Sequence, residues 1–302
     1  MNCFKKLYLG LAASAVLLTG PALSQEGRGD VVYVPTPQIV VDEMLRMAKI
    51  GPNDFLIDLG SGDGRFVITA AKKFGARGFG VDLDTYLLRA ARKNAQSEGV
   101  SDRANFVEQN LFETDLSQAT VISSYLLPEM NLKLRPKILA LKPGTRVVAH
   151  DYHMGDWYPD DQRDIPVPEK KVGTPGISYV YLWHVPARVA GKWQTQLNAA
   201  GKEVPYEIAF DQLFQILEGS LRGGSESAIL RGRLNGDQIT FTTQPKGSPG
   251  NQRHDFTGKV DGDTMTGTVR IGEGANVRQA NWSAKLTARG EMRRGKDEAE
   301  GR

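Results

Sequence analysis

The sequence is nearly free of cysteine, because Cys3 is the only one in 302 residues. A single thiol excludes a disulfide framework within the chain, so the fold has to rest on its hydrophobic core. A chain of this length easily supplies such a core. The absence of any thiol beyond the first few residues also fits an oxidising compartment.

The sequence also lacks a large excess of positive or negative charge. The chain has 38 Lys and Arg against 35 Asp and Glu, for a formal net charge of +3. Its basic residues do not cluster, and aromatic side chains do not interleave with them. We therefore expect neither a strongly charged nucleic-acid-binding surface nor a membrane-binding one.

The apolar run near the N-terminus is too short for a comfortable membrane span. Leu7–Leu18 covers about a dozen residues, whereas a spanning helix needs roughly 20. Lys5 and Lys6 precede this run, and small residues follow it up to Ser24. The pattern describes a secretory signal peptide, residues 1–24, and favours its removal over anchoring. We expect an exported, periplasmic protein whose net charge falls to about +1 when the two lysines leave.

A glycine-rich turn is the most informative segment that is present. Asp58–Arg65, with the sequence DLGSGDGR, directly follows the apolar residues Phe55–Ile57. It predicts a strand that runs through a turn into a helix. Gly60, Gly62 and Gly64 let the backbone turn sharply and let a ligand approach the main chain closely. A nucleotide-like cofactor needs this geometry where a parallel strand meets a helix N-terminus.

The acidic residues around the turn indicate the charge of that cofactor. Asp58 and Asp63 would repel a pyrophosphate but attract a cationic sulfonium or amino group. About two dozen residues on, Gly78–Asp82 predicts a second strand ending in an acid, the position that binds ribose hydroxyls in such units. The candidate cofactor-binding residues of these segments are Asp58, Gly60, Ser61, Gly62 and Asp82.

The rest of the first half alternates short apolar strands with helical patterns. We expect helices over 85–98 and 126–141, and strands over 105–108, 119–125, 146–150 and 176–183. The last strand would close the sheet. This alternation predicts a doubly wound, mostly parallel, Rossmann-like sheet in an α/β domain spanning residues 31–186.

Several of these segments resemble a known family. Asp58–Arg65 resembles motif I of the class I S-adenosylmethionine-dependent methyltransferases, whose turn cradles the amino acid part of the cofactor. Together with Tyr33–Pro37 and Tyr125–Asn131, it is similar to bacterial methyltransferases related to the FAM173-like protein-lysine methyltransferases, themselves similar to the Dot1 histone-lysine enzymes. The resemblance covers roughly residues 31–184. It implies S-adenosyl-L-methionine as cofactor and a protein lysine as methyl acceptor.

The resemblance also implies roles for residues after the third strand and before the first helix. Asn110 and Leu111 stand where such enzymes usually read the adenine. Many relatives carry Asp at the position of Asn110, and an amide serves there as a mixed donor and acceptor. Tyr33 and Thr36 would form an N-terminal lid over the cofactor. Alternatively, this segment is an extended lead-in, with Thr36 bonding the start of the next helix.

Two residues after the fourth strand are the catalytic candidates. Tyr125 and Glu129 lie at the carboxyl edge of the sheet, where ligands bind in open α/β folds. Methyl transfer depends on positioning and on a deprotonated nucleophile. Tyr125 could wall the acceptor channel, or simply pack under the helix. Glu129 could hold or deprotonate a cationic amine, or simply favour the helix dipole as a first-turn carboxylate.

The segment His150–Asp161 contains two histidines and several carboxylates. Its spacing fixes no third metal ligand, so we predict no metal site. An acidic and aromatic loop of this kind could attract a cationic acceptor, although a solvated loop with buried aromatic anchors is the simpler expectation.

From residue 187 the pattern changes to short alternating runs separated by Gly, Asn and Asp. Turns such as Asn235–Asp237 and Asp261–Asp263 are typical of hairpins. We predict a small antiparallel barrel or sandwich over residues 187–288, followed by a disordered tail over 289–302. This domain shows no catalytic constellation.

Export conflicts with the cytoplasmic synthesis of S-adenosylmethionine. The leading hypothesis is a methyltransferase that acts on a protein lysine. The alternatives are a non-catalytic exported binding protein that retains the fold, and a small-molecule methyltransferase.

Overall fold

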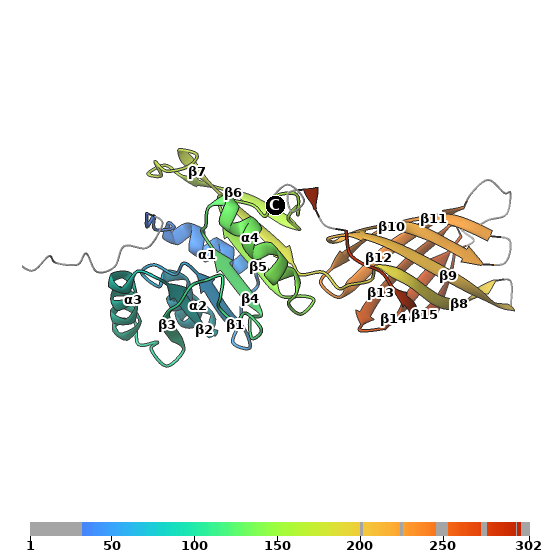
Figure 1. Ribbon diagram of the computed structural model, residues 1–302, viewed down its shortest axis with the longest axis horizontal. Helices are drawn as coiled ribbons and strands as arrows, with labels where there is room; N and C mark the ends of the chain where they lie inside the picture. Colours follow the sequence, from blue (N-terminus) through green and yellow to red (C-terminus); the bar gives the residue numbers. More distant parts are fainter. Residues whose placement is uncertain are drawn as a thin grey trace, which may run out of the picture.

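The computed structural model describes residues 32–199, 202–223, 226–245, 253–272, 277–293 and 295–296. An α/β sheet domain occupies the N-terminal half of this part of the chain, and a closed β-barrel occupies the C-terminal half (Figure 1). The predicted fold class is thereby confirmed. The predicted signal peptide, residues 1–24, lies outside the described residues. Within the ranges given above, no helix is long and apolar enough to cross a membrane.

The sheet of the α/β domain has seven strands in the order β3-β2-β1-β4-β5-β7-β6. Its strands are β1 (Phe55–Leu59), β2 (Arg77–Asp82), β3 (Ala104–Glu108), β4 (Val121–Ser124), β5 (Arg146–His150), β6 (Asp161–Val167) and β7 (Gly176–His184). Its helices are α1 (Gln38–Met47), α2 (Arg65–Phe74), α3 (Thr85–Ser97) and α4 (Pro128–Leu139). The strands β1 to β5 run parallel, and their order reverses between β1 and β4. Ligands bind beside such a reversal in open α/β sheets.

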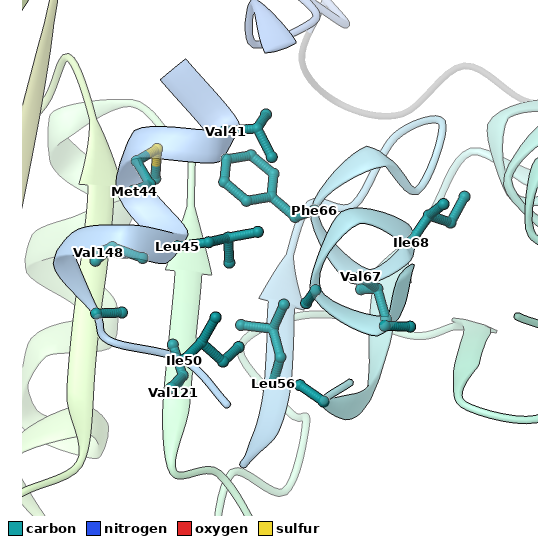
Figure 2. Packing of buried hydrophobic residues seen from close by; sticks show 14 of the residues in the cluster. Val41, Met44, Leu45, Ile50, Leu56, Phe66, Val67, Ile68, Val121 and Val148 are labelled. Carbon is teal, nitrogen blue, oxygen red and sulfur yellow. The ribbon is translucent and has the colours of Figure 1, made fainter. Parts of the chain in front are cut away.

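Alternation along the strands builds a separate core on each face of the sheet. Leu56 packs with α1, α2 and α3 on one face, where Figure 2 shows it beside Leu45 and Phe66. Its neighbour Ile57 faces the opposite core, where α4 contributes Ile138. Burying each such side chain stabilises the fold by about 1.5–3 kcal/mol. The two cores hold the strand ends, and therefore the loops after them, in fixed positions.

The edge of the sheet beyond β5 differs from the prediction. The expected late strand is present as β7, but β7 pairs antiparallel with β5 on one side and with β6 on the other. The edge strand is therefore β6, which the sequence pattern did not indicate. Only Ile165 and Val167 of β6 are buried, and Pro166 lies between them. A strand at a sheet edge needs little apolar alternation and tolerates proline.

The C-terminal domain is a barrel rather than a sandwich. Its strands are β8 (Gly191–Ala199), β9 (Lys202–Leu213), β10 (Ile216–Gly223), β11 (Glu226–Asn235), β12 (Gln238–Pro245), β13 (His254–Asp261), β14 (Thr264–Ile271) and β15 (Arg278–Arg289). Pairing of β15 with β8 closes the ring. Aromatic rings fill the interior, and Phe241 stacks on Phe256 with centroids 4.3 Å apart while Trp282 meets both edge-on. The barrel interior is thus a packed core.

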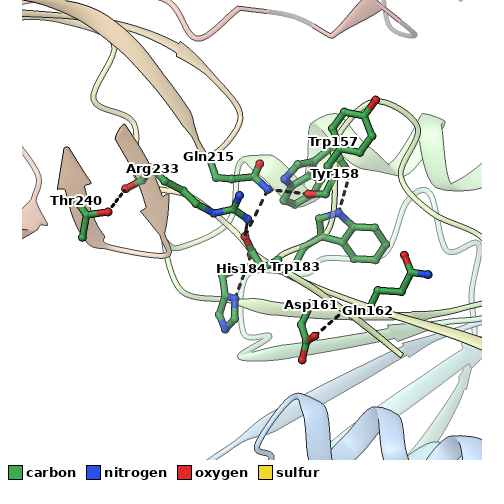
Figure 3. Close-up of polar contacts among 10 residues, drawn as sticks. Trp157, Tyr158, Asp161, Gln162, Trp183, His184, Gln215, Arg233 and Thr240 are labelled. Atoms are coloured by element: carbon green, nitrogen blue, oxygen red, sulfur yellow. Dashed lines mark hydrogen bonds and ion pairs between the residues drawn. The ribbon is translucent and has the colours of Figure 1, made fainter. Parts of the chain in front are cut away.

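The two domains meet through a polar and aromatic joint, part of which Figure 3 shows. The carboxylate of Asp160 in the α/β domain accepts hydrogen bonds from Arg233 of the barrel at 2.6 Å and from the backbone N–H of His184 at 2.7 Å. Gln215 of the barrel donates to the carbonyl of Tyr158 at 2.7 Å. Burial alone would raise the pKa of Asp160, but the bonds from His184 and Arg233 outweigh burial and lower it. Directed hydrogen bonds therefore fix how the barrel contacts the α/β domain at this joint.

The segment after β15 returns to this joint. Met292 packs against the core that α4 covers, and Arg293 pairs with Asp211 at 2.7 Å. Disorder was expected over 289–302. The described part of that segment makes these contacts, and residues 294 and 297–302 lie outside the described residues.

Candidate functional site

A cleft of about 270 Å³ opens at the carboxyl ends of β1, β2 and β4, beside the reversal in strand order. Most of the residues proposed from the sequence line it, namely Tyr33, Thr36, Asp58, Gly60, Ser61, Asp82, Asn110, Leu111 and Tyr125. The fold thus collects segments from several loops at one edge of the sheet.

The glycine turn wraps closely around the end of β2. The N–H groups of Gly60 and Ser61 both donate to the carbonyl of Val81 at 2.9 Å. Gly60 has a φ of 77° and Gly62 a φ of 51°, a conformation that side chains rarely adopt. A Cβ at Gly62 would overlap the ring of Tyr33. Glycine is therefore required here by the backbone and by the close approach of the lid segment.

A buried carboxylate lies at the base of the cleft. Asp58 is 2% exposed, and its Oδ1 accepts from the Ser123 hydroxyl at 2.6 Å. Its Oδ2 and the hydroxyl of Ser61 have no hydrogen-bond partner among the described residues. Burial, aided by repulsion from Asp82 and only partly opposed by the Ser123 bond, raises the pKa of Asp58 to about 8. An unpartnered buried acceptor in an acidic setting fits a cationic amino group.

Asp82 joins the glycine turn to the next helix. Its Oδ2 accepts from the N–H of Gly62 at 2.8 Å, and its Oδ1 accepts from the N–H of Asp84 at 2.9 Å. Each carboxylate oxygen has a second lone pair, so Asp82 can also accept from ribose hydroxyls. Asp84 in turn caps α3 by accepting from the N–H groups of Tyr86 and Leu87.

Beyond Asp82, the adenine end of the cleft is formed by Asn110 and Leu111. Asn110 Oδ1 accepts from the N–H of Phe112 at 3.0 Å. The side-chain NH₂ group then remains as the donor that can bond a base edge.

The N-terminal segment covers the cleft through an arginine clamp that the sequence did not suggest. Arg65 donates to the carbonyl of Thr36 at 2.5 Å, to the Tyr33 hydroxyl at 3.4 Å and to both oxygens of Asp63. The sequence signal was the basic residue at the end of the glycine motif, but its partners Tyr33 and Thr36 lie about 30 residues away in sequence. The Thr36 hydroxyl bonds His150 Nδ1 at 3.1 Å, while Pro37 is the N-cap of α1. The alternative in which Thr36 caps the next helix is therefore wrong.

The two catalytic candidates are placed differently. Tyr125 lines the cleft, and its hydroxyl donates to Asp151 Oδ2 at 3.3 Å. Glu129 is exposed in the first turn of α4 and is not among the lining residues. Its position favours the helix-dipole explanation.

The segment that begins with the last residue of β5 is less exposed to solvent than expected. His150 is 1% exposed, and burial lowers its pKa to about 4. Asp151 follows it with a side chain only 4% exposed, while His153 is exposed. In the described part of the chain, no group of three or more His, Cys, Asp or Glu side chains is arranged to hold a metal ion.

The cleft therefore fits S-adenosylmethionine on its own geometry. Asp58 and Ser61 present unpartnered acceptors for the amino group. Asp82 and Asn110 also line the cleft, with groups that are able to bond hydroxyls and a base edge. Tyr125 and Tyr152 line it as well.

Known proteins with related sequences carry out this chemistry. Residues 58–161 match the family model of the ANTKMT methyltransferase domain. A protein-lysine N-methyltransferase of Saccharolobus islandicus is 46% identical over 133 residues, covering 43% of this chain and 83% of that protein. The adenine nucleotide translocase lysine N-methyltransferase of Mus musculus is 32% identical over 134 residues, covering 44% of this chain and 58% of that protein. The chain thus spans little more than half the length of this mouse relative.

Among solved structures, an RNA methyltransferase from Salinibacter ruber in complex with S-adenosyl-L-homocysteine is similar. Its sequence identity is 48% and its TM-score is 0.46, with 52% of this chain and 96% of that chain covered.

Proposed function

We propose that this chain, which belongs to the class I S-adenosylmethionine-dependent methyltransferases, methylates the side-chain amine of lysine in a protein. The curated relatives reported above are named for lysine acceptors, and they favour neither a non-catalytic binding protein nor a small-molecule methyltransferase. The acceptor protein itself is left open by these names.

S-adenosylmethionine supplies, when bound, an electrophilic methyl group on a cationic sulfur, and transfer to a neutral amine leaves an N-methylammonium and S-adenosylhomocysteine, whose sulfur is uncharged. Asp58 and Ser61 hold the amino acid part, Asp82 the ribose, and Asn110 with Leu111 the adenine. Tyr33 and Arg65 close the N-terminal segment over the cleft and exclude water.

The pairing of Tyr125, which lines the cleft, with Asp151 next to it carries the proposal. Burial, reinforced by the Asp151 carboxylate, raises the pKa of Tyr125 well above its usual range. Tyr125 therefore stays protonated and acts as a wall and an orienting donor, not as a base. The acceptor ammonium loses its proton to solvent before methylation, since positioning counts for more than a strong base in this reaction.

The first test is titration calorimetry of S-adenosylmethionine into the purified protein. We expect micromolar binding that is lost in Asp82→Ala and kept in Asp102→Ala, because Asp102 has a 74% exposed side chain and precedes the amino end of β3, at the sheet edge opposite the cleft. Binding that survives Asp82→Ala would contradict the assigned cofactor site.

The second test is mass spectrometry of lysine-containing peptides and proteins after incubation with enzyme and cofactor. A mass increase of one or more methyl groups on lysine, absent in Asp82→Ala, supports the proposal. Methylation of a small amine or an RNA control without methylation of any lysine would overturn the protein-lysine acceptor.

We further propose export to the periplasm, from the basic residues, short apolar run and small residues of 1–24. Mass spectrometry of the N-terminus after expression and fractionation in a Gram-negative host tests this. A mature chain beginning at Gln25 in the periplasmic fraction supports export, and an intact cytoplasmic chain contradicts it.

A further inference from the structure

The tip of the β6–β7 hairpin reaches the cleft on its Tyr125 side. Val172 in this tip lines the cleft, together with Tyr125 and Tyr152. Two residues before it, Lys170 turns its side chain inward, so that only 6% of that side chain is exposed. Its neighbour Lys171 is exposed. A buried lysine requires a partner, because an unpaired ammonium is costly to remove from water.

The partner of Lys170 is Asp151. The Lys170 ammonium lies 2.7 Å from Oδ1 and 2.6 Å from Oδ2 of that carboxylate, and it also donates to the carbonyl of Ile177 at 2.5 Å. The ammonium is therefore held by the charge of Asp151 and by the hydrogen bond that it donates to a carbonyl of its own hairpin.

The backbone and the carboxylate of Asp151 are both fixed in place by neighbouring groups. Its backbone has a φ of 60°, which few residues with side chains adopt, and its N–H donates to the carbonyl of Tyr179 at 2.7 Å. Its Oδ1 accepts from the N–H of Tyr179 at 3.1 Å, while its Oδ2 accepts from the Tyr125 hydroxyl. Strain of this kind at the end of a central strand persists where the surroundings fix it, and it clusters at binding sites.

The aromatic rings beside Asp151 are those that wall the cleft. The rings of Tyr125 and Tyr152 lie nearly parallel, with centroids 6.2 Å apart and planes inclined by 20°. An alkyl chain with a terminal ammonium suits such a setting, because aromatic walls bury the methylenes and attract the cation. Asp151 and Lys170 are not among the residues that line the cleft, but Asp151 bonds the hydroxyl of Tyr125, which is. Lys170 thus presents, next to the cleft wall, the chemical group that an acceptor lysine would bring.

We propose that Asp151 recognises the cationic amine of the acceptor, and that Lys170 occupies this position in the free protein as an intramolecular substitute. This inference rests on the proposed lysine acceptor. The hairpin tip has to withdraw Lys170 before an acceptor lysine can reach Asp151. The exchange replaces one ammonium by another, so the buried carboxylate stays paired at the end of it. The apparent affinity for the acceptor falls by the fraction of molecules in which the hairpin is open.

Chemical labelling of the wild-type protein tests the closed state directly. Under limiting reductive methylation with formaldehyde, followed by mass spectrometry, Lys170 should react at least tenfold more slowly than Lys171. In Asp151→Asn the rate at Lys170 should rise towards that of Lys171. Asparagine tolerates the left-handed φ of residue 151, so this variant removes the charge and keeps the backbone. Equal reactivity of the two lysines in the wild type would overturn the proposal.

Binding of n-butylamine, a primary amine on a four-carbon chain, tests the amine site without catalysis. An NMR titration should show saturable binding to Lys170→Ala, at least tenfold weaker binding to the wild type, and none to Lys170→Ala/Asp151→Asn. The control Lys171→Ala should behave as the wild type. No saturable binding to Lys170→Ala, in a protein whose thermal unfolding shows it to be folded, would count against an amine site at Asp151.

Steady-state kinetics then separates this inference from the proposed function. With a lysine peptide, Lys170→Ala should lower KM about tenfold and Asp151→Asn should raise it, with the affinity for S-adenosylmethionine unchanged in both. If lysine is methylated and neither variant changes KM, the inference is wrong. If no variant methylates lysine while Lys170→Ala still binds n-butylamine, the proposed acceptor is wrong and the amine site stands.

Discussion

The ring of Phe214 stacks on Trp157, with centroids 6.0 Å apart and planes inclined by 23°. Phe214 lies in the turn between β9 and β10 of the barrel, whereas Trp157 is fully buried in the α/β domain. The Arg135 guanidinium lies 5.3 Å from the centre of the same phenyl ring. A barrel residue thus completes the core that supports α4 and, through it, the loop carrying Tyr125.

Phe214→Ala should therefore destabilise the protein by about 3–5 kcal/mol, the usual cost of removing a buried phenyl ring. Denaturant unfolding measures this. Ile216→Ala in the same hairpin is the control, because Ile216 is 41% exposed and should change the free energy of unfolding by only about 0.5 kcal/mol. Equal effects of the two substitutions would show that Phe214 does not join the domains.

The raised pKa of Asp58 predicts proton release on cofactor binding. At pH 7 a carboxyl group with a pKa of about 8 is mostly protonated in the free protein. A cationic amino group beside it favours the ionised form, so binding should expel a proton into the buffer. Calorimetry in buffers of different ionisation enthalpy measures this release.

Asp58→Asn should abolish the proton release and weaken binding by about 1.5–3 kcal/mol, the cost of a lost charged hydrogen bond. Release of the same size in the variant at pH 7 would mean that another group is its source.

Gly62→Ala should weaken cofactor binding by displacing the lid. A methyl group at this position would overlap the Tyr33 ring, and the φ of 51° strains any side chain. Gly99→Ala is a matched control, because Gly99 has a φ of 66° and open space around its Cα. Both variants should lose about 1 kcal/mol of folding stability from the backbone. Only Gly62→Ala should also lose S-adenosylmethionine affinity, measured by calorimetry, and equal affinities would exclude the lid contact.

Buried His150 predicts loss of stability in mild acid. Burial lowers its pKa to about 4, while the unfolded chain protonates the ring near pH 6.5. Between about pH 6.5 and pH 4 the imidazole of His150 is thus protonated in the unfolded state and neutral in the folded state. The free energy of unfolding should therefore fall as the pH drops from about 6.5 to about 4.

Asparagine at this position cannot titrate. In His150→Asn the free energy of unfolding should therefore fall less steeply between about pH 6.5 and pH 4, whatever its value at pH 7. Denaturant unfolding across this pH range compares the slopes. An unchanged slope would assign the acid sensitivity to other groups.

Local sequence was sufficient to predict most of the residues that line one half of the cleft. Asp58, Gly60 and Gly62 belong to one short segment whose conformation its glycines dictate, and Asp82 follows at the spacing of one strand–helix–strand unit. Glu129 shows the limit of this reasoning. Its position after β4 suggested catalysis, but the rotation of α4 against the sheet turns it to solvent.

The amine pair could not be found in the same way. Asp151 and Lys170 are separated by a loop and by the edge strand β6, whose pattern did not mark it as a strand. Their contact depends on how the β6–β7 hairpin folds back. The choice between barrel and sandwich likewise depended on the pairing of β15 with β8, the last and the first strand of that domain in the sequence.

The sequence by itself determined the α/β class, the cofactor turn and the change to β structure near residue 187, because each follows from glycine placement or from apolar periodicity over a few residues. Tertiary structure alone decided the arginine clamp over Tyr33, the burial of Asp151 with Lys170, and the seating of Phe214 on Trp157. These contacts join residues that no local pattern relates, and they form only when two cores bring distant strand ends and turns to the same place.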